Sequence, residues 1–320
     1  MSHQPSNTTN STPLCQSDIV MEIEHFVKYI MQCDHNGVLR TPEIEFWYYT
    51  HLLGALPRYL SVYSLCHEYS EHIEAFWIGC DAAGLLPEHA HFGKVDYAMD
   101  RLNLDSACLL VETIAHYTHT LDFTRRSGDR YYQTQAKNQG LSAYVESVLN
   151  RYTRTLVVRV DLKYASATKH LVGIDDVFDH RDALKRLMAT HPLFNALTGY
   201  VCTNEQGGEC GGYHIHGTFF FNGHERRAGQ FIGQQIGELW EQITDGLGRY
   251  FNCNSSEHTK GYLANGTLGV DMILRKNPIE CANCVRTVGY LAKPGKVGQY
   301  LRIKPLGRRC FVRGSSPRAK

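Results

Sequence analysis

The sequence predicts an α+β protein in which an α-helical half precedes a half built on an antiparallel sheet. Three observations lead to this fold class. Apolar residues recur at helical spacing through the first 150 residues. A segment rich in β-branched residues, Thr155–Lys163, then indicates a buried strand. Finally, a glycine-rich turn at 206–212 separates two strand-like segments, which predicts a hairpin.

The first half is expected to be a helical domain covering residues 17–150. Its opening apolar stripe consists of Ile19, Ile23, Phe26, Val27 and Ile30. Similar stripes follow in residues 46–65, 73–86 and 104–121. No motif here indicates chemistry, so duplex DNA recognition, helicase docking and oligomerisation all remain open as its role. Residues 1–16 are polar and are predicted to be a disordered tail.

The second half, residues 151–313, alternates strand and helix patterns. After the strand at 155–163, we expect a helix at 175–190 and the hairpin strands at 197–203 and 213–221. Two further helices are predicted at 231–243 and 279–293, with a last strand at 299–304. Residues 314–320 form a basic tail.

Composition indicates a globular protein of the cytosol. Hydrophobic residues make up 43% and charged residues 20% of the chain, and no apolar run is long enough to span a bilayer. The 11 cysteines show no regular framework, so reduced thiols are expected. The net charge is only +1, yet residues 286–320 contain ten Lys or Arg and no Asp or Glu. This basic end suggests an anionic partner.

Two histidines on one predicted strand are candidate metal ligands. His214 and His216 are two residues apart, so they project to the same face, while Ile215 faces the other way. Glu205, on the preceding strand of the hairpin, is the candidate third ligand, and Asp161 on the earlier strand is its rival. Two imidazoles and a carboxylate would suit Mg²⁺ or Mn²⁺ acting as a Lewis acid.

A tyrosine and a lysine follow on a predicted helix. Tyr290 and Lys293 are three residues apart and therefore share one helix face, with Pro294 and Gly295 ending the helix. A tyrosine hydroxyl is a poor nucleophile at neutral pH, so attack on a phosphate needs a bound metal and a nearby positive charge. Alone, such a pair is common on helix surfaces.

Together these motifs resemble the HUH endonuclease superfamily, whose rolling-circle initiators carry a His–hydrophobic–His strand followed by a helix with Tyr-x-x-Lys. His214-Ile-His216 and Tyr290-Leu-Ala-Lys293 match in order, and Glu205 matches the family's metal-binding glutamate. Residues 150–313 look more narrowly like the inovirus replication-protein family, also called the YagK/YfjJ C-terminal domain. This likeness rests on three sequence segments: Val-Arg-Val-Asp-Leu, Gly-Gly-Tyr-His-Ile-His and Gly-Tyr-Leu-Ala-Lys-Pro-Gly.

The resemblance implies a sheet of about five antiparallel strands flanked by helices, and Tyr290 as a nucleophile that nicks single-stranded origin DNA. The products would be a 5′-phosphotyrosine and a free 3′-OH, which primes host DNA polymerase before the strand is rejoined. A host helicase is expected as a partner because the chain has no P-loop motif. The implied setting is a prophage, filamentous phage or mobile island in the bacterial cytoplasm.

Basic residues near the C-terminus could follow a phosphate backbone. These candidate DNA contacts are Lys296, Arg302, Lys304, Arg308 and Arg309. Tyr213 and Tyr262 are aromatic candidates for base stacking, although packing is the commoner role of such residues.

Other interpretations carry weaker support. In conjugative relaxases the tyrosine precedes the histidines, and single-tyrosine transposases are usually shorter. A DNA-binding regulator of the same fold that does not cut is the alternative from a different class. A structural zinc site at Cys281 and Cys284, with Cys202 and Cys210, is a further alternative, but one CxxC without a spaced partner is a weak signal.

Overall fold

A computed structural model describes residues 14–86, 94–207, 212–290 and 299–315, and it confirms the α+β fold class. The helical part comes first and contains α1 (Gln16–His35), α2 (Pro42–Leu60), α3 (Glu71–Ala82), α4 (Lys94–Arg101) and α5 (Leu104–Thr118), with a short strand β1 (His67–Tyr69). The expected stripe of α1 is buried: Ile23, Val27 and Ile30 have no exposed surface. These side chains recur every three or four residues and face the other helices.

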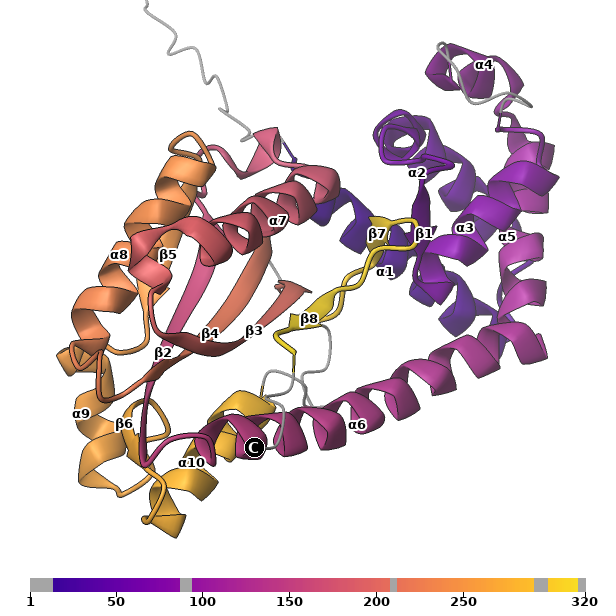
Figure 1. Cartoon of the computed structure of the whole chain (residues 1–320). Helices are drawn as coiled ribbons and strands as arrows, with labels where there is room; N and C mark the ends of the chain where they lie inside the picture. The colour runs from indigo at the N-terminus through magenta and orange to yellow at the C-terminus, as the bar shows by residue number, and fades with distance from the viewer. Residues whose placement is uncertain (1–13, 87–93, 208–211, 291–298, 316–320) are drawn as a thin grey trace, which may run out of the picture.

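The long helix α6 (Leu121–Leu149) joins the two parts of the chain. It begins at Thr120, whose side chain accepts a hydrogen bond from the backbone N–H of Phe123. Figure 1 shows α6 running from the helical part to the sheet. Its last two turns, from Leu141, pack with α10 (Pro278–Gly289) against the sheet. The secondary structure therefore changes near residue 150, while the packing crosses that point.

The main sheet has six antiparallel strands in the order β5-β2-β4-β3-β8, and β6 also pairs with β2. Its strands are β2 (Arg154–Tyr164), β3 (Leu197–Gln206), β4 (Tyr213–Asn222), β5 (Gly248–Asn252), β6 (Asp271–Leu274) and β8 (Phe311–Arg313). The predictions of β2, β3, β4 and their hairpin are confirmed, as is the antiparallel sheet. The sequence analysis missed β5, which lies in a stretch rich in glycine and asparagine, and β6, which follows that stretch.

The end of the chain differs from the prediction in two ways. The expected strand at 299–304 is wrong, because β7 (Ile303–Pro305) is shorter and pairs with β1 of the helical part in a separate two-stranded sheet. The strand that completes the main sheet is instead β8. The last helix, α10, is described to Gly289, and its expected end at Lys293 falls outside the described residues. Residues 291–298 lie outside the described part of the chain.

Helices cover both faces of the main sheet (Figure 1). One face packs against α7 (Ile174–Thr190) and α8 (Gly229–Ile243) and contributes to the larger core, which continues into the helical part. The other face packs against α6 and α10 through Val157, Val201 and Phe220. Within the described residues, no helix is both long and apolar enough to cross a membrane.

A buried ion pair connects the two parts. Glu24 of α1 and Arg302 are paired, and their side chains are 1% and 4% exposed. The hydroxyl of Tyr300 donates to Glu24 at 2.6 Å, and Lys28 lies 2.6 Å from the same carboxylate. Two buried opposite charges must remain together, because either alone would carry a large desolvation cost. This pair therefore fixes α1 against the segment that precedes β7.

We expect Glu24→Gln to lower the free energy of unfolding at pH 7 by about 3 kcal/mol, because Arg302 would keep its charge in a buried site. Burial raises the pKa of Glu24, but the charge of Arg302 and hydrogen bonds from Lys28, Tyr300 and Arg302 bring it down to about 2. The carboxylate therefore stabilises the fold above its unfolded pKa of about 4.3, and this contribution is lost as pH falls through 2.

Urea unfolding of wild type and Glu24→Gln from pH 7 to pH 2 measures this effect, and the difference should shrink below about pH 4.5. Lys28→Gln is the control, since Lys28 is half-exposed and its loss should cost less than about 1 kcal/mol. A difference in unfolding free energy between wild type and Glu24→Gln that does not change with pH would contradict the role of the Glu24 carboxylate in this ion pair.

Candidate metal centre

The hairpin of β3 and β4 brings the three predicted metal ligands together. Glu205 pairs with His214, and Thr203 pairs with His216. Residues directly opposite one another on antiparallel strands share a face, as do residues two apart on one strand. All three ligand candidates therefore lie on one face of the sheet, and Ile215 is fully buried on the other.

The three side chains are close enough to hold one ion. The Oε2 atom of Glu205 lies 3.3 Å from Nε2 of His216 and 3.7 Å from Nε2 of His214. One ligand atom from each residue falls within 4.8 Å of the others. The side chains are 6%, 9% and 13% exposed for Glu205, His216 and His214, so an ion here would be largely shielded from water. The identity of the metal is not fixed by this set, which accepts Mn²⁺ as readily as several other divalent ions.

Asp161, the rival ligand, has a different position. It pairs with His216 across β2 and β4, and its Oδ1 lies 2.6 Å from Nδ1 of the imidazole. Because Nδ1 is engaged by Asp161, Nε2 of His216 faces Glu205 and is the nitrogen available to a metal. A carboxylate that accepts the second ring N–H of a histidine fixes its tautomer and orientation. Asp161 therefore orients a candidate ligand, a role that the sequence analysis missed.

The electrostatics of this cluster favour bound positive charge. Burial raises the pKa of Asp161, but the hydrogen bond from His216 and the charges of His216, Arg159 and Lys163 lower it to about 2. Burial lowers the pKa of His216, but hydrogen bonds with Asp161 and Glu205 raise it above its usual value overall. The two carboxylates thus stabilise a proton on His216, and a divalent cation would take the place of that proton.

Gln206, the residue after Glu205, makes hydrogen bonds to two other segments of the chain. Gln206 is fully buried, and its Nε2 donates to the backbone oxygen of Ser17 in α1 at 2.8 Å. Its Oε1 accepts from the backbone N–H of Arg302 at 3.2 Å. The same Arg302 pairs with Glu24. The helical part thus stabilises the end of β3 that carries the Glu205 carboxylate.

Tyr290 follows directly after α10, which lies on the same face of the sheet as the three ligand candidates. Val288 is fully buried in the cluster with Val201 and Phe220, and Phe220 is four residues from His216 on β4. Tyr290 itself is 47% exposed. It occupies the C-cap position, where its backbone N–H bonds to Arg286. Lys293 lies outside the described residues, so its position relative to Tyr290 stays a prediction.

The basic residues of the C-terminal segment differ in their burial and in their ion-pair partners. Arg302 is buried and paired with Glu24, which corrects its assignment as a DNA contact. Lys304 pairs with Glu68. Arg308 lies 2.8 Å from Asp182, whereas Arg309 is exposed. Lys296 lies outside the described residues.

The zinc alternative finds no support among the described cysteines. Cys202 and Cys284 are both buried, but they belong to clusters on opposite faces of the sheet. Burial raises the pKa of the Cys202 thiol to about 12, whereas zinc binds the thiolate. Cys281 donates from its thiol to the backbone oxygen of Leu274. Cys210 lies outside the described residues.

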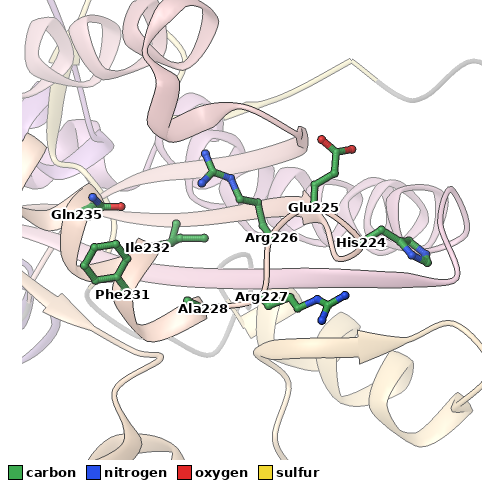
Figure 2. Close-up of a pocket in the computed structure, with 8 residues that line it drawn as sticks. All are labelled: His224, Glu225, Arg226, Arg227, Ala228, Phe231, Ile232 and Gln235. Atoms are coloured by element: carbon green, nitrogen blue, oxygen red, sulfur yellow. The ribbon is translucent and has the colours of Figure 1, made fainter.

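A shallow pocket of about 350 Å³ lies at the turn between β4 and α8 (Figure 2). It is beyond Asn222, eight residues along β4 from His214, and so roughly 27 Å from the metal centre. Figure 2 shows Arg226 and Arg227 leaving the turn in different directions. Arg226 donates to the backbone oxygens of Asn195, Pro192 and Leu193. This pocket is therefore separate from the candidate metal centre.

Comparison of the chain with known protein families, with curated proteins and with solved structures found no match.

We expect the protein to bind one Mn²⁺ per chain, because the described residues bring together one set of three suitable ligands. Alanine at Glu205, His214 or His216 should weaken binding by more than about a hundredfold, beyond the range typical of losing a residue that only orients a ligand. Isothermal titration calorimetry measures the effect, with His224→Ala as a control. Unchanged affinity in all three variants would contradict the assignment.

Asp161→Asn should weaken the same binding by about 10- to 100-fold while one ion still binds, because the amide leaves the ligand nitrogens in place but orients His216 less well. Asp271→Asn, at a half-buried carboxyl of β6, is the matched control. Complete loss of binding in Asp161→Asn would instead make Asp161 a direct ligand.

Proposed function

We propose that this protein is a metal-dependent endonuclease of the HUH type that initiates rolling-circle replication. The observation that carries the proposal is the cluster of Glu205, His214 and His216 on one face of an antiparallel sheet. The order of the motifs adds support, because Tyr290 and Lys293 follow the histidines as they do in the rolling-circle initiators that this sequence resembles.

The reaction is a transesterification at one phosphodiester of single-stranded DNA. A bound Mg²⁺ or Mn²⁺ supplies Lewis acidity at the phosphate. The phenol oxygen of Tyr290 attacks the phosphorus and loses its proton, and the bond from phosphorus to the 3′ oxygen breaks. That oxygen takes up a proton and becomes a free 3′-OH, while the 5′ phosphate stays on the tyrosine. Attack by a 3′-OH reverses the reaction and rejoins the strand.

The residues of the site have distinct roles in this proposal. Glu205, His214 and His216 hold the cation, and Asp161 keeps Nε2 of His216 directed toward it. Tyr290 is exposed at the end of a helix that packs on the same face, so its hydroxyl can meet a strand bound there. Lys293 would stabilise the charge on the phosphate, a role taken from the motif.

The partners follow from the chemistry. The substrate is single-stranded origin DNA, and the free 3′-OH would prime a host DNA polymerase. Unwinding would fall to a host helicase. The resemblance to inovirus replication proteins supports the proposal that this activity belongs to a prophage, filamentous phage or mobile island, in the bacterial cytoplasm. Lys296, Lys304, Arg308 and Arg309 are the proposed contacts to the DNA backbone.

The test is formation of a covalent adduct with labelled single-stranded DNA from the protein's own genetic element, in Mn²⁺ or Mg²⁺. Wild type should give a product that survives denaturation, whereas Tyr290→Phe should give none, because the nucleophilic oxygen is missing. Tyr132→Phe, at another exposed tyrosine, should react like wild type. EDTA should abolish the reaction.

Two results would contradict this proposal. If wild type binds these strands but forms no adduct on any of them, the protein is a DNA-binding regulator that does not cut. If Tyr290→Phe still forms the adduct, another residue is the nucleophile and the motif assignment fails.

A further inference from the structure

Three aromatic rings form an exposed cluster on β5 and α9 (Ser256–Ala264). The ring centroids of Phe251 and His258 are 5.0 Å apart, and those of His258 and Tyr262 are 5.4 Å apart. Phe251 is 43% exposed and Tyr262 is 50% exposed. No described residue of α9 is buried. The cluster thus presents aromatic surface to solvent that core packing does not require.

This cluster lies on the same face of the sheet as the candidate metal centre. Phe251 pairs with Asp161 across β5 and β2, and Asp161 pairs with His216 across β2 and β4. Paired residues share a face, so Phe251, Asp161 and His216 form one row across three strands. Neighbouring strands are about 4.8 Å apart, which puts the backbone of Phe251 roughly 10 Å from that of His216.

Close packing on the opposite face fixes the direction of Phe251. A Cβ atom added at Gly237 of α8 would lie 2.2 Å from the ring of Tyr250, and one at Gly233 would lie 2.4 Å from Asn252. Helix α8 therefore approaches β5 as closely as glycine allows. Because Tyr250 and Asn252 point toward α8, Phe251 between them points to the face of the metal centre.

Positive charge borders the rings. Lys163 and Arg249 pair across β2 and β5 beside Phe251. Lys163 is exposed, and Arg249 is 58% exposed although it lies 3.8 Å from the carboxylate of Glu241 in α8. The nearest carboxylate on the row, Asp161, is engaged by His216. Exposed flat rings beside cationic side chains suit a chain of phosphates and bases better than an apolar peptide.

We propose that Phe251, His258 and Tyr262 form a base-stacking platform that holds single-stranded nucleic acid beside the metal centre. This inference rests on the proposed function for its choice of ligand, and it identifies where the strand lies. A base stacked on Tyr262 or Phe251 would leave its neighbouring phosphates along the row that leads to His216. Stacking tolerates any base, so the platform would bind the strand without reading its sequence.

The experiment measures binding of a fluorescein-labelled oligothymidine of about 12 nucleotides, within the usual site size of such surfaces, by fluorescence anisotropy in EDTA. Without a divalent ion no strand is cut, so binding is separated from the proposed nicking. Tyr262→Ala and Phe251→Ala should each raise Kd about fivefold or more. Tyr262→Phe keeps the ring and should leave Kd unchanged.

Two controls isolate stacking from other effects. Leu263→Ala changes an exposed apolar residue of the same helix and should alter Kd less than twofold. An oligonucleotide of equal length without bases should bind wild type and Tyr262→Ala equally, because only phosphate contacts remain.

The outcomes separate this inference from the proposed function. If Tyr262→Ala and Phe251→Ala bind oligothymidine as wild type does, or if wild type does not bind it, the platform is refuted. If the alanine variants bind more weakly but wild type forms no adduct in the nicking assay, the platform stands and the covalent step fails.

Discussion

The position of β4 between β2 and β3 is the constraint on which the site depends. Its pairing with β3 places Glu205 opposite His214, and its pairing with β2 places Asp161 opposite His216. A shift of one residue in either register would turn the partner side chains to the other face. The apolar residues between them, such as Ile215, are buried against the core and oppose that shift. Burial on one face therefore fixes the chemistry on the other.

The sequence was sufficient for features that depend on local spacing. The shared face of His214 and His216 follows from strand alternation, and the position of Glu205 follows from the hairpin that joins its strand to theirs. The role of Asp161 was not predictable, since it depends on pairing between strands far apart in the chain. Arg302 was misassigned for the same reason: its partner Glu24 lies in the first helix, and no local pattern indicates that contact.

The two faces of the sheet differ in what covers them and in the residues they carry. The face under α7 and α8 is apolar and joins the core that extends into the helical part. The other face is apolar only where α6 and α10 cover it, and beyond them it carries the ligand candidates, Asp161 and Phe251. A divided face of this kind supports a site with a rigid backbone, because the packed half of each strand holds in place the half that carries the ligand candidates.

Helix α6 also bears on how such a protein can diversify. Its first turns lie among the helices, and its last turns, from Leu141 to Leu149, are part of the core beneath the sheet. A recombination event at the change of secondary structure near residue 150 would separate that core from its own sheet. Exchange of the helical half between related proteins is therefore compatible with folding only under two conditions. The junction between the two sequences must lie within α6, upstream of Leu141. The incoming first helix must also carry an acidic residue that pairs with Arg302.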